Sequence, residues 1–382
     1  MTTLSFAQHC TMGLVIRWLL IIYANYHDRK FSVPYTDVDY RVYTDASRMM
    51  VNGDSPYDRH TYRYTPLLAS ILIPNILLHG DFGKVFFSFI DIVVTILTRN
   101  TLLNGSCKTS NAETYALAWL YNPLTIVITT RGNADSLAVL LVLSTLFFLR
   151  KENPILAGLL HGLSIHFRLY PIAFSLSMYL SLREKNLFFP NAKQAKLVVA
   201  CISSLVFFTS VSYYFYGYKY LYESMIYHLM RKDARHNFSV FFYATYLSTS
   251  LTINIFKRII TFLPQLLVLV AISLRYSDRK HLPFAIFTQA IVMVAYNPVM
   301  TSQYFFWFLS LLPVCLPDIR MSVKRWLAST TFWLIAQGIW LFDAYLLEFQ
   351  GLNTFHRIWL DGILFFIVNL KILYDMIKYY ER

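Results

Sequence analysis

Residues 197–217 read LVVACISSLVFFTSVSYYFYG, and no charged residue interrupts them. A helix that crosses a membrane needs about 20 mostly apolar residues, so this stretch predicts a membrane-spanning helix. Several other apolar runs are shorter than about 17 residues, which is typical of broken helices that line a cavity. The runs lie at residues 10–26, 66–80, 83–103, 112–130, 134–149, 155–167, 169–182, 197–217, 241–256, 259–274, 282–300, 303–317, 326–346 and 357–377. We therefore expect an all-α polytopic membrane protein with about 10 to 13 transmembrane helices.

The composition supports the same fold class. Of the 382 residues, 56% are hydrophobic and 14% are charged, whereas soluble proteins carry about 25% charged residues. The apolar runs are continuous and do not alternate, which disfavours a transmembrane β-barrel. The four cysteines suggest no disulfide framework. No linker separates soluble domains, so we expect one multi-pass domain over residues 1–382, beginning with an uncleaved N-terminal anchor.

The connecting loops fall into two alternating sets. The first set is short and basic, and the positive-inside rule places it in the cytoplasm together with both termini. It comprises residues 150–151, 183–196, 275–280, 320–325 and 371–382. The second set mixes acids, bases and amides and should lie on the opposite, lumenal side; it comprises residues 35–66, 131–136, 166–171, 231–239, 301–304 and 348–355. The net charge of +13 is then explained by membrane orientation and an anionic ligand, with no need for nucleic acid. Of the two sequons, Asn104 falls on the cytoplasmic side and Asn237 on the lumenal side.

The first lumenal loop, residues 27–65, is the longest polar segment. Asp37 and Asp39 lie two residues apart, so in an extended segment both carboxylates face one way. Such a pair can hold a divalent ion, orient a sugar hydroxyl, or act as a base with an orienting group. The alternative is a solvated loop whose acids are helix caps or arginine partners. Residues 40–51 show helical spacing and end at a C-cap pair, which predicts a helix along the membrane surface.

Basic residues recur beside the apolar segments on the lumenal side. They are Arg63, Arg131, Arg168, Arg235 and His236, the last two within a polar cluster at residues 231–237. Each alone can snorkel to a head group or pair with a loop acid. Together they predict a site for an anionic group at membrane depth, such as a lipid-linked phosphate.

Amides, hydroxyls and aromatic rings on the same side suit a sugar. The candidates are Asn133, Asp135, Asn237, Gln303, Tyr304, Glu348, Gln350 and Asn353. The alternative is that these side chains satisfy backbone groups at helix ends. Arg17 and Asp91, within apolar runs, are interpreted first as interhelical partners. His161 and His166 lack the spacing of a helical metal pair, so zinc is not expected.

Several longer motifs resemble a known family. YTDVDYRVYTDASR at 35–48, GDSPY at 53–57 and TYRYTPLL at 61–68 closely resemble the first lumenal loop of glycosylphosphatidylinositol (GPI) mannosyltransferase I, the PIG-M family. RGNADS at 131–136, HNFS at 236–239, TSQYF at 301–305 and EFQGLNTF at 348–355 resemble that family's later motifs, in the same order. The resemblance implies a GT-C type glycosyltransferase of the endoplasmic reticulum. It would move mannose from dolichol-phosphate mannose to glucosaminyl-phosphatidylinositol in an α1,4 linkage, together with a small single-pass stabilising subunit, PIG-X or its fungal counterpart.

The implied reaction assigns roles to the polar residues. The donor is a β-linked mannosyl phosphate and the product is α-linked, so one displacement with inversion suffices. Asp37 is the expected base and Asp39 orients the acceptor or the loop. Basic groups should meet the leaving phosphate; the leading candidates are Arg235, His236 and Arg63, followed by Arg131 and Arg168. No metal cofactor is expected, although the Asp37/Asp39 pair leaves a divalent ion open. The competing interpretations are a secondary transporter for a polar or anionic solute and a non-catalytic scaffold.

Overall fold

The computed structural model describes residues 4–184, 189–230, 233–248 and 255–381, and it describes side chains outside residues 229–230 and 255–261. Within these ranges the regular secondary structure is helical, apart from one isolated bridge between Ile319 and Tyr380. The predicted all-α class is therefore confirmed. The chain divides into two compact units, Met1–Met230 and Arg231–Arg382.

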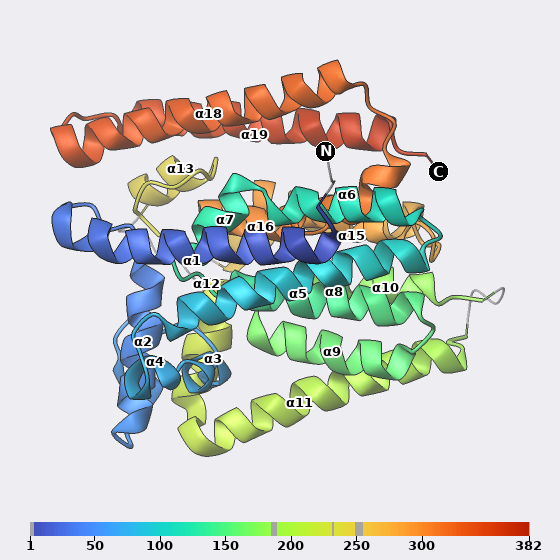
Figure 1. Cartoon of the computed structure of the whole chain (residues 1–382), viewed down its shortest axis with the longest axis horizontal. Helices are drawn as coiled ribbons and strands as arrows, with labels where there is room; N and C mark the ends of the chain where they lie inside the picture. Colours follow the sequence, from blue (N-terminus) through green and yellow to red (C-terminus); the bar gives the residue numbers. More distant parts are fainter. Residues whose placement is uncertain (1–3, 185–188, 231–232, 249–254, 382) are drawn as a thin grey trace. The chain divides into compact units, whose positions relative to one another are not determined.

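The N-terminal unit is built around five neighbouring helices, which pack in the order α1, α5, α8, α9 and α11 (Figure 1). Its elements are α1 (Phe6–Lys30), α2 (Val38–Val51), η1 (Pro56–Asp58), α3 (Pro66–Ile71), α4 (Pro74–Leu77), α5 (Phe82–Asn104), α6 (Thr109–Leu120), α7 (Pro123–Thr130), α8 (Asp135–Arg150), α9 (Pro154–Phe167), η2 (Tyr170–Phe174), α10 (Ser175–Ser181), α11 (Ala192–Leu221), η3 (Tyr222–Ile226) and α12 (Tyr227–Met230). The apolar run at 197–217 thus forms the middle of α11, which begins earlier because Asn191 and Gln194 form a capping box.

The C-terminal unit contains a long pair of neighbouring helices, α18 and α19, together with shorter ones. Its elements are α13 (Phe242–Leu247), α14 (Ile255–Arg275), α15 (Leu282–Ala295), η4 (Ser302–Tyr304), α16 (Phe305–Leu309), α17 (Leu312–Cys315), η5 (Leu316–Asp318), α18 (Val323–Gln350) and α19 (Phe355–Lys378).

Four stretches among the described residues are long and apolar enough to cross a membrane: Phe6–Lys30, Phe82–Asn104, Ala192–Ile226 and Val323–Gln350. Of the shorter runs, 66–80, 169–182 and 303–317 are divided into several short helices, as predicted, whereas 134–149 and 155–167 each form one helix. The single apolar run expected over 112–130 is wrong, because these residues form two helices, α6 and α7. Asn122 caps α7, and Pro123 in the first turn of α7 cannot continue α6. The predicted 10 to 13 crossings stay a prediction.

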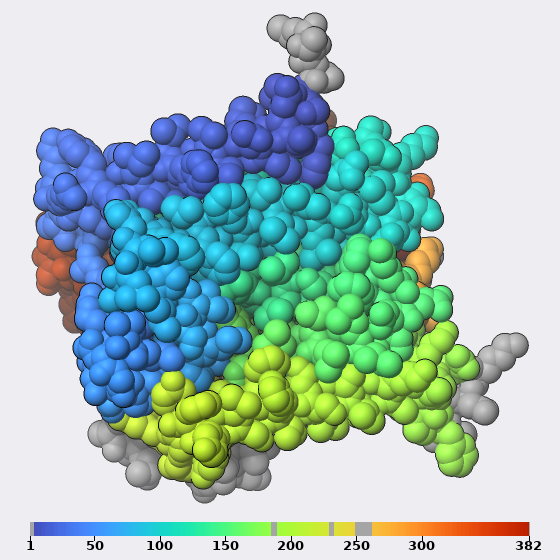
Figure 2. Space-filling view, turned by 60° about the horizontal axis from the view of Figure 1, so that its bottom comes forward, coloured from blue at the N-terminus to red at the C-terminus, as the bar shows by residue number. Residues whose placement is uncertain are grey.

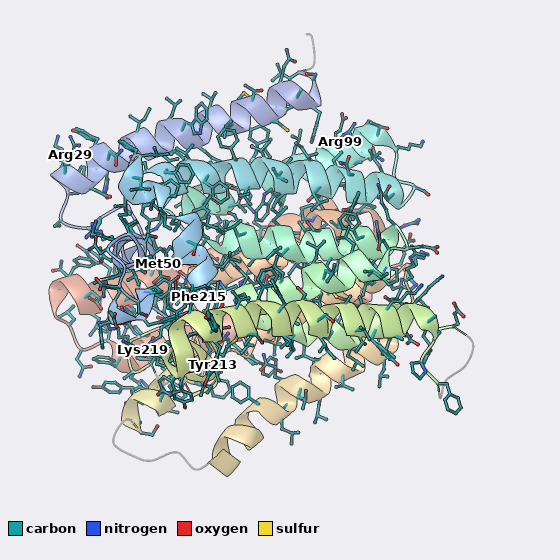
Figure 3. All side chains as sticks on the ribbon, turned by 90° about the horizontal axis from the view of Figure 1, so that it is seen from below. Arg29, Met50, Arg99, Tyr213, Phe215 and Lys219 are labelled. Carbon is teal, nitrogen blue, oxygen red and sulfur yellow. The ribbon has the colours of Figure 1, made fainter. Side chains whose placement is uncertain are left out.

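The two predicted sets of loops lie at opposite ends of the long helices in the N-terminal unit. Figure 3 shows Arg29, Met50 and Lys219 near one end and Arg99 toward the other. The polar loops are in contact, since the Asp37 amide donates to the Arg131 carbonyl at 2.9 Å. In the C-terminal unit, the amide of Phe238 likewise donates to the carbonyl of Met300 at 3.1 Å.

The helix expected at residues 40–51 is α2, and it begins two residues earlier, at Val38. It runs across the long helices in Figure 1 and is seen close to end-on in Figure 3. This is the orientation of a helix that lies parallel to a membrane spanned by α1, α5 and α11. Figure 2 shows α1 in dark blue and α11 in yellow-green at two edges of this unit. Both helices expose apolar side chains, including Ile22, Val199 and Phe207, as a surface facing lipid requires.

Candidate active site

Asp37 and Asp39 meet at the start of α2. Asp37 is the N-cap, and its Oδ1 accepts a hydrogen bond from the Asp39 amide at 3.0 Å. Asp39 lies in the first helical turn. The expectation of an extended segment is therefore wrong, and the alternative of an acid that caps a helix is correct for Asp37. Both side chains remain partly exposed, so the cap leaves a carboxylate pair that a substrate can reach.

The turn between α7 and α8 packs directly against this pair. The Asp37 amide donates to the carbonyl of Arg131, the C-cap residue of α7. Gly132 follows with φ +92°, and a Cβ there would lie 2.4 Å from Cδ2 of Tyr40. Only glycine meets both demands. This close approach holds the first lumenal loop and residues 131–135 in one arrangement.

The surroundings of Asp37 raise its pKa. Burial is the largest cause, and the negative charge of Asp39 adds to it, while Arg131 and Asn133 lower the pKa in part. A carboxylate whose pKa is raised is a stronger general base when it is ionised. This environment suits proton abstraction from a hydroxyl.

Arg131 is the predicted phosphate-binding residue whose charge acts on Asp37. Its side chain is partly exposed. Within the described part of the chain it forms no ion pair, although Asp37 lies close enough to feel its charge. Its guanidinium therefore remains available to an anionic ligand.

Arg168 has a different environment. Its Nη2 lies 2.8 Å from Oδ1 of Asp135, with 14% and 1% of the two side chains exposed. The guanidinium also covers the ring of Tyr64, 4.7 Å from its centroid. The hydroxyl of Tyr64 donates to Oδ2 of Asp39 at 2.8 Å. Arg168 and Asp135 thus support Asp39 through Tyr64, a residue that the sequence reasoning did not select even though it lies in the TYRYTPLL motif.

Arg63 contacts three residues near the C-terminal end of the N-terminal unit. It pairs with Glu223, and its guanidinium lies 4.0 Å from the ring centroid of Tyr227. His228 Nε2 lies 2.8 Å from the Arg63 carbonyl. Arg63 therefore follows the alternative interpretation from the sequence, in which an arginine pairs with an acid. No local sequence pattern identified Glu223 as its partner.

The remaining predicted residues form a second group, in the C-terminal unit. Nδ1 of His236 lies 3.6 Å from Oε1 of Glu348. Asn237 is buried, and its side-chain oxygen accepts from the amides of Ser239 and Met300 at 3.0 and 3.3 Å. Asn237 therefore satisfies backbone groups, which is the alternative that the sequence left open.

The other polar candidates of this unit are less enclosed. Arg235 is exposed, and its amide donates to Asp233. Gln350 and Asn353 are exposed at the end of α18, where the Gln350 side chain donates to the Tyr345 hydroxyl at 3.2 Å. Gln303 and Tyr304 lie in η4, and Tyr304 stacks on Trp307 at 4.5 Å. Residues 231–232 of the predicted polar cluster lie outside the described residues.

No three metal-binding side chains gather around one point in the described part of the chain. The pair at Asp37 and Asp39 supplies two carboxylates, and a third carboxylate, Asp135, is already paired with Arg168. A divalent ion there would need further ligands from substrate or water.

Comparison with known proteins agrees with the motifs. The profile of the family described as "Mannosyltransferase (PIG-M)" matches residues 128–377. The chain is 42% identical to "GPI mannosyltransferase 1" of Dictyostelium discoideum, over 96% of this chain and 90% of the relative. It is also 42% identical to "GPI alpha-1,4-mannosyltransferase I, catalytic subunit" of Danio rerio, over 96% and 95%. Its identity to "GPI mannosyltransferase 1" of Saccharomyces cerevisiae is 38%, over 95% and 92%.

Proposed function

The chain belongs to the PIG-M family of mannosyltransferases, which act in GPI-anchor biosynthesis, and from this premise we propose its donor, acceptor and mechanism. The donor is dolichol-phosphate mannose and the acceptor is glucosaminyl-phosphatidylinositol. The linkage formed is α1,4, as the name of the Danio rerio relative states for that protein. The enzyme works in the endoplasmic reticulum membrane with its active site on the lumenal side, and a small single-pass subunit stabilises it.

One observation supports this mechanism most strongly. A partly buried carboxylate with a raised pKa, Asp37, lies beside an arginine, Arg131, that has no ion pair among the described residues. A displacement at a mannosyl phosphate needs such a base for the incoming hydroxyl and a cation for the outgoing phosphate. The two groups are joined by the backbone hydrogen bond between residues 37 and 131.

The reaction is one in-line displacement with inversion. Asp37 accepts the proton of the acceptor's 4-hydroxyl as its oxygen forms a bond to the anomeric carbon of mannose. The bond from that carbon to the phosphate oxygen breaks, and its electron pair leaves with dolichyl phosphate. Asp39, held by Tyr64, orients the acceptor.

The leaving phosphate gains negative charge, which a preorganised cation stabilises. In the N-terminal unit Arg131 is the leading candidate, because Arg63 is paired with Glu223 and Arg168 with Asp135. Arg235 and His236 are the candidates from the C-terminal unit. A leaving monophosphate develops less charge than a diphosphate, so this mechanism includes no metal step.

The decisive test is mannosyl transfer by the purified chain with its subunit, using both lipid substrates. Asp37→Asn, compared at equal protein amount, should lower the rate at least about 100-fold, the usual contribution of a positioned base. Asp54→Asn is the matched control, since Asp54 is an exposed acid in the same loop. Asp37→Asn activity within about threefold of the parent would exclude Asp37 as the base.

A further inference from the structure

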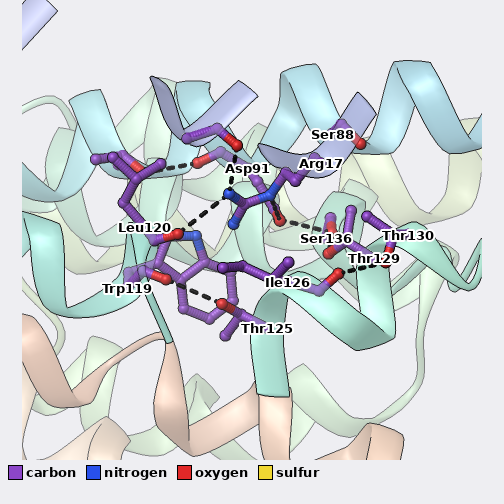
Figure 4. A network of polar contacts seen from close by, with 12 residues as sticks. Arg17, Ser88, Asp91, Trp119, Leu120, Thr125, Ile126, Thr129, Thr130 and Ser136 are labelled. Atoms are coloured by element: carbon purple, nitrogen blue, oxygen red, sulfur yellow. Dashed lines mark hydrogen bonds and ion pairs between the residues drawn. The ribbon is translucent and has the colours of Figure 1, made fainter. Parts of the chain in front are cut away.

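A buried polar network lies within the N-terminal unit and joins its helices α1, α5, α6, α7 and α8 (Figure 4). Arg17 of α1 pairs with Asp91 of α5, Nε to Oδ2 at 3.0 Å, and neither side chain is exposed. Arg17 also donates to the carbonyls of Gly13 and Leu120, each at 3.1 Å. Burying two charges is costly, and such a pair contributes little net stability compared with apolar packing. A role in fixing geometry is therefore the better explanation of this pair.

The second carboxylate oxygen of Asp91 extends the network to the turn between α7 and α8. The Ser136 hydroxyl donates to Asp91 Oδ1 at 2.9 Å. The Ser136 and Thr129 hydroxyl oxygens are 3.2 Å apart, and both side chains are fully buried. Thr129 precedes residues 131–135 and Ser136 follows them, so the two hydroxyls hold both ends of the turn.

Ser136 bonds differently from two other buried hydroxyl residues, Thr95 and Thr145. Thr95 in α5 and Thr145 in α8 donate to carbonyls of their own helices, those of Asp91 and Leu141. This is the usual way to satisfy a hydroxyl inside a helix. Ser136 donates to a neighbouring helix instead, and the acceptor is itself fixed by Arg17.

We propose that Ser136 and Thr129, anchored by the Arg17–Asp91 pair, are positioning residues that hold the turn 131–135 and thereby place Arg131 against Asp37. The link to the reaction rests on the proposed function of Asp37. The structural link is the hydrogen bond from the Asp37 amide to the Arg131 carbonyl at 2.9 Å. Neither hydroxyl is exposed, so neither residue touches substrate.

Three variants separate positioning from folding. Ser136→Ala and Thr129→Val remove the hydroxyls with little change in volume, whereas Thr129→Ser keeps the hydroxyl. Thr145→Val is the matched control, because Thr145 is buried in α8 and its hydroxyl donates to the Leu141 carbonyl. Variants of Arg17 or Asp91 are avoided, since each would leave a buried charge unpaired and strongly destabilise the fold.

We expect Ser136→Ala and Thr129→Val to lower kcat for mannosyl transfer about tenfold, because a small displacement of a reacting group is costly. The acid limb of their pH profiles should move to higher pH, since Arg131 and Asn133 lower the pKa of Asp37 only when they are held near it. Thr129→Ser and Thr145→Val should match the parent in both respects. Hydrogen exchange of the amides of residues 131–135 should be faster in Ser136→Ala than in Thr145→Val.

The exchange measurement does not depend on the substrate, so the two proposals can fail separately. If the parent enzyme does not use dolichol-phosphate mannose, the proposed function fails while the exchange result still decides whether the network holds the turn. Unchanged exchange at residues 131–135 in Ser136→Ala would overturn the positioning role. An active variant with a parental pH profile and less folded protein would overturn it as well, because a purely structural role predicts that result.

Discussion

The hydroxyl of Tyr64 donates a hydrogen bond to the Asp39 carboxylate, with 2.8 Å between the two oxygens. The ring of Tyr64 also lies under the Arg168 guanidinium. One side chain thus connects the acidic pair at the start of α2 with the buried Arg168–Asp135 ion pair. The Asp37–Asp39 pair is therefore part of a preorganised site, because residues from other segments orient the Asp39 carboxylate.

Replacing Tyr64 with phenylalanine tests this connection. Tyr64→Phe keeps the ring beneath Arg168 and removes only the hydroxyl. Hydrogen bonds to charged groups contribute about 1.5–3 kcal/mol, so we expect kcat/KM for mannosyl transfer to fall at least about tenfold. Tyr26→Phe is the control, since Tyr26 is exposed on α1. A Tyr64→Phe enzyme with parental kcat/KM would show that Asp39 does not need this bond.

The pH dependence of the rate should report the environment of Asp37. The base must be ionised, so the rate should fall as the pH drops through the raised pKa of Asp37, at higher pH than for an ordinary aspartate. Asp39 raises this pKa and Arg131 lowers it. Asp39→Asn should therefore move the acid limb to lower pH, and Arg131→Gln should move it to higher pH.

The midpoint of the acid limb in kcat/KM profiles provides the measurement, and it can be read even where the maximal rate is reduced. Asp54→Asn, which changes an exposed acid in the same loop, should leave the midpoint unchanged. Shifts of the same sign in Asp39→Asn and Arg131→Gln would mean that Asp37 is not the titrating group.

The sequence predicted the helical elements well because length and apolar continuity decide them locally. It also selected Asp37 and Asp39, although the expected extended segment was wrong, and it ranked Arg131 behind Arg235, His236 and Arg63. The role of Asp37 as an N-cap could have been predicted, because aspartate is favoured at the position directly before a helix. Arg131 and Asp135 lie four residues apart, which is the spacing of a pair on one helix face. Gly132, with φ +92°, interrupts the helix between them, and Asp135 pairs with Arg168 instead.

Pairs of residues distant in sequence could not be predicted. Arg63 and Glu223 meet because η3 follows the Gly217 kink in α11, and nothing local in either segment specifies the partner. The Ser136–Asp91 bond is of the same kind. Such contacts depend on the helix packing order, which hydropathy does not reveal.

Asn237 is buried, which predicts that its sequon is not glycosylated. Its side-chain nitrogen donates to the Arg235 carbonyl at 3.0 Å, and its oxygen accepts from two backbone amides. We therefore expect no glycan at this sequon, measured by mobility after glycosidase treatment and by mass spectrometry. Asp54→Ser creates a sequon at the exposed Asn52 and should be glycosylated if the first loop is lumenal. A glycan at Asn237 in the folded parent would contradict the buried arrangement.

The close packing of α9 against α11 predicts that enlarging a glycine between them lowers the stability of the protein. A Cβ on Gly162 would lie 2.3 Å from the carbonyl oxygen of Cys201, and one on Gly158 would lie 2.4 Å from that of Leu197. Small residues at this spacing let membrane helices approach closely. A larger side chain must push the backbones apart, which costs about 1–3 kcal/mol or more.

Gly162→Leu should therefore lower the thermal unfolding temperature of the detergent-solubilised protein by several degrees, since about 1 kcal/mol shifts it by roughly 2–4 °C in proteins of 150–250 residues. Gly338→Leu is the matched control, because a Cβ at Gly338 in α18 meets nothing within 4 Å. Both substitutions add the same side chain inside a helix, so the difference between them isolates the α9–α11 contact. Equal unfolding temperatures for the two variants would mean that α9 and α11 are not packed this closely.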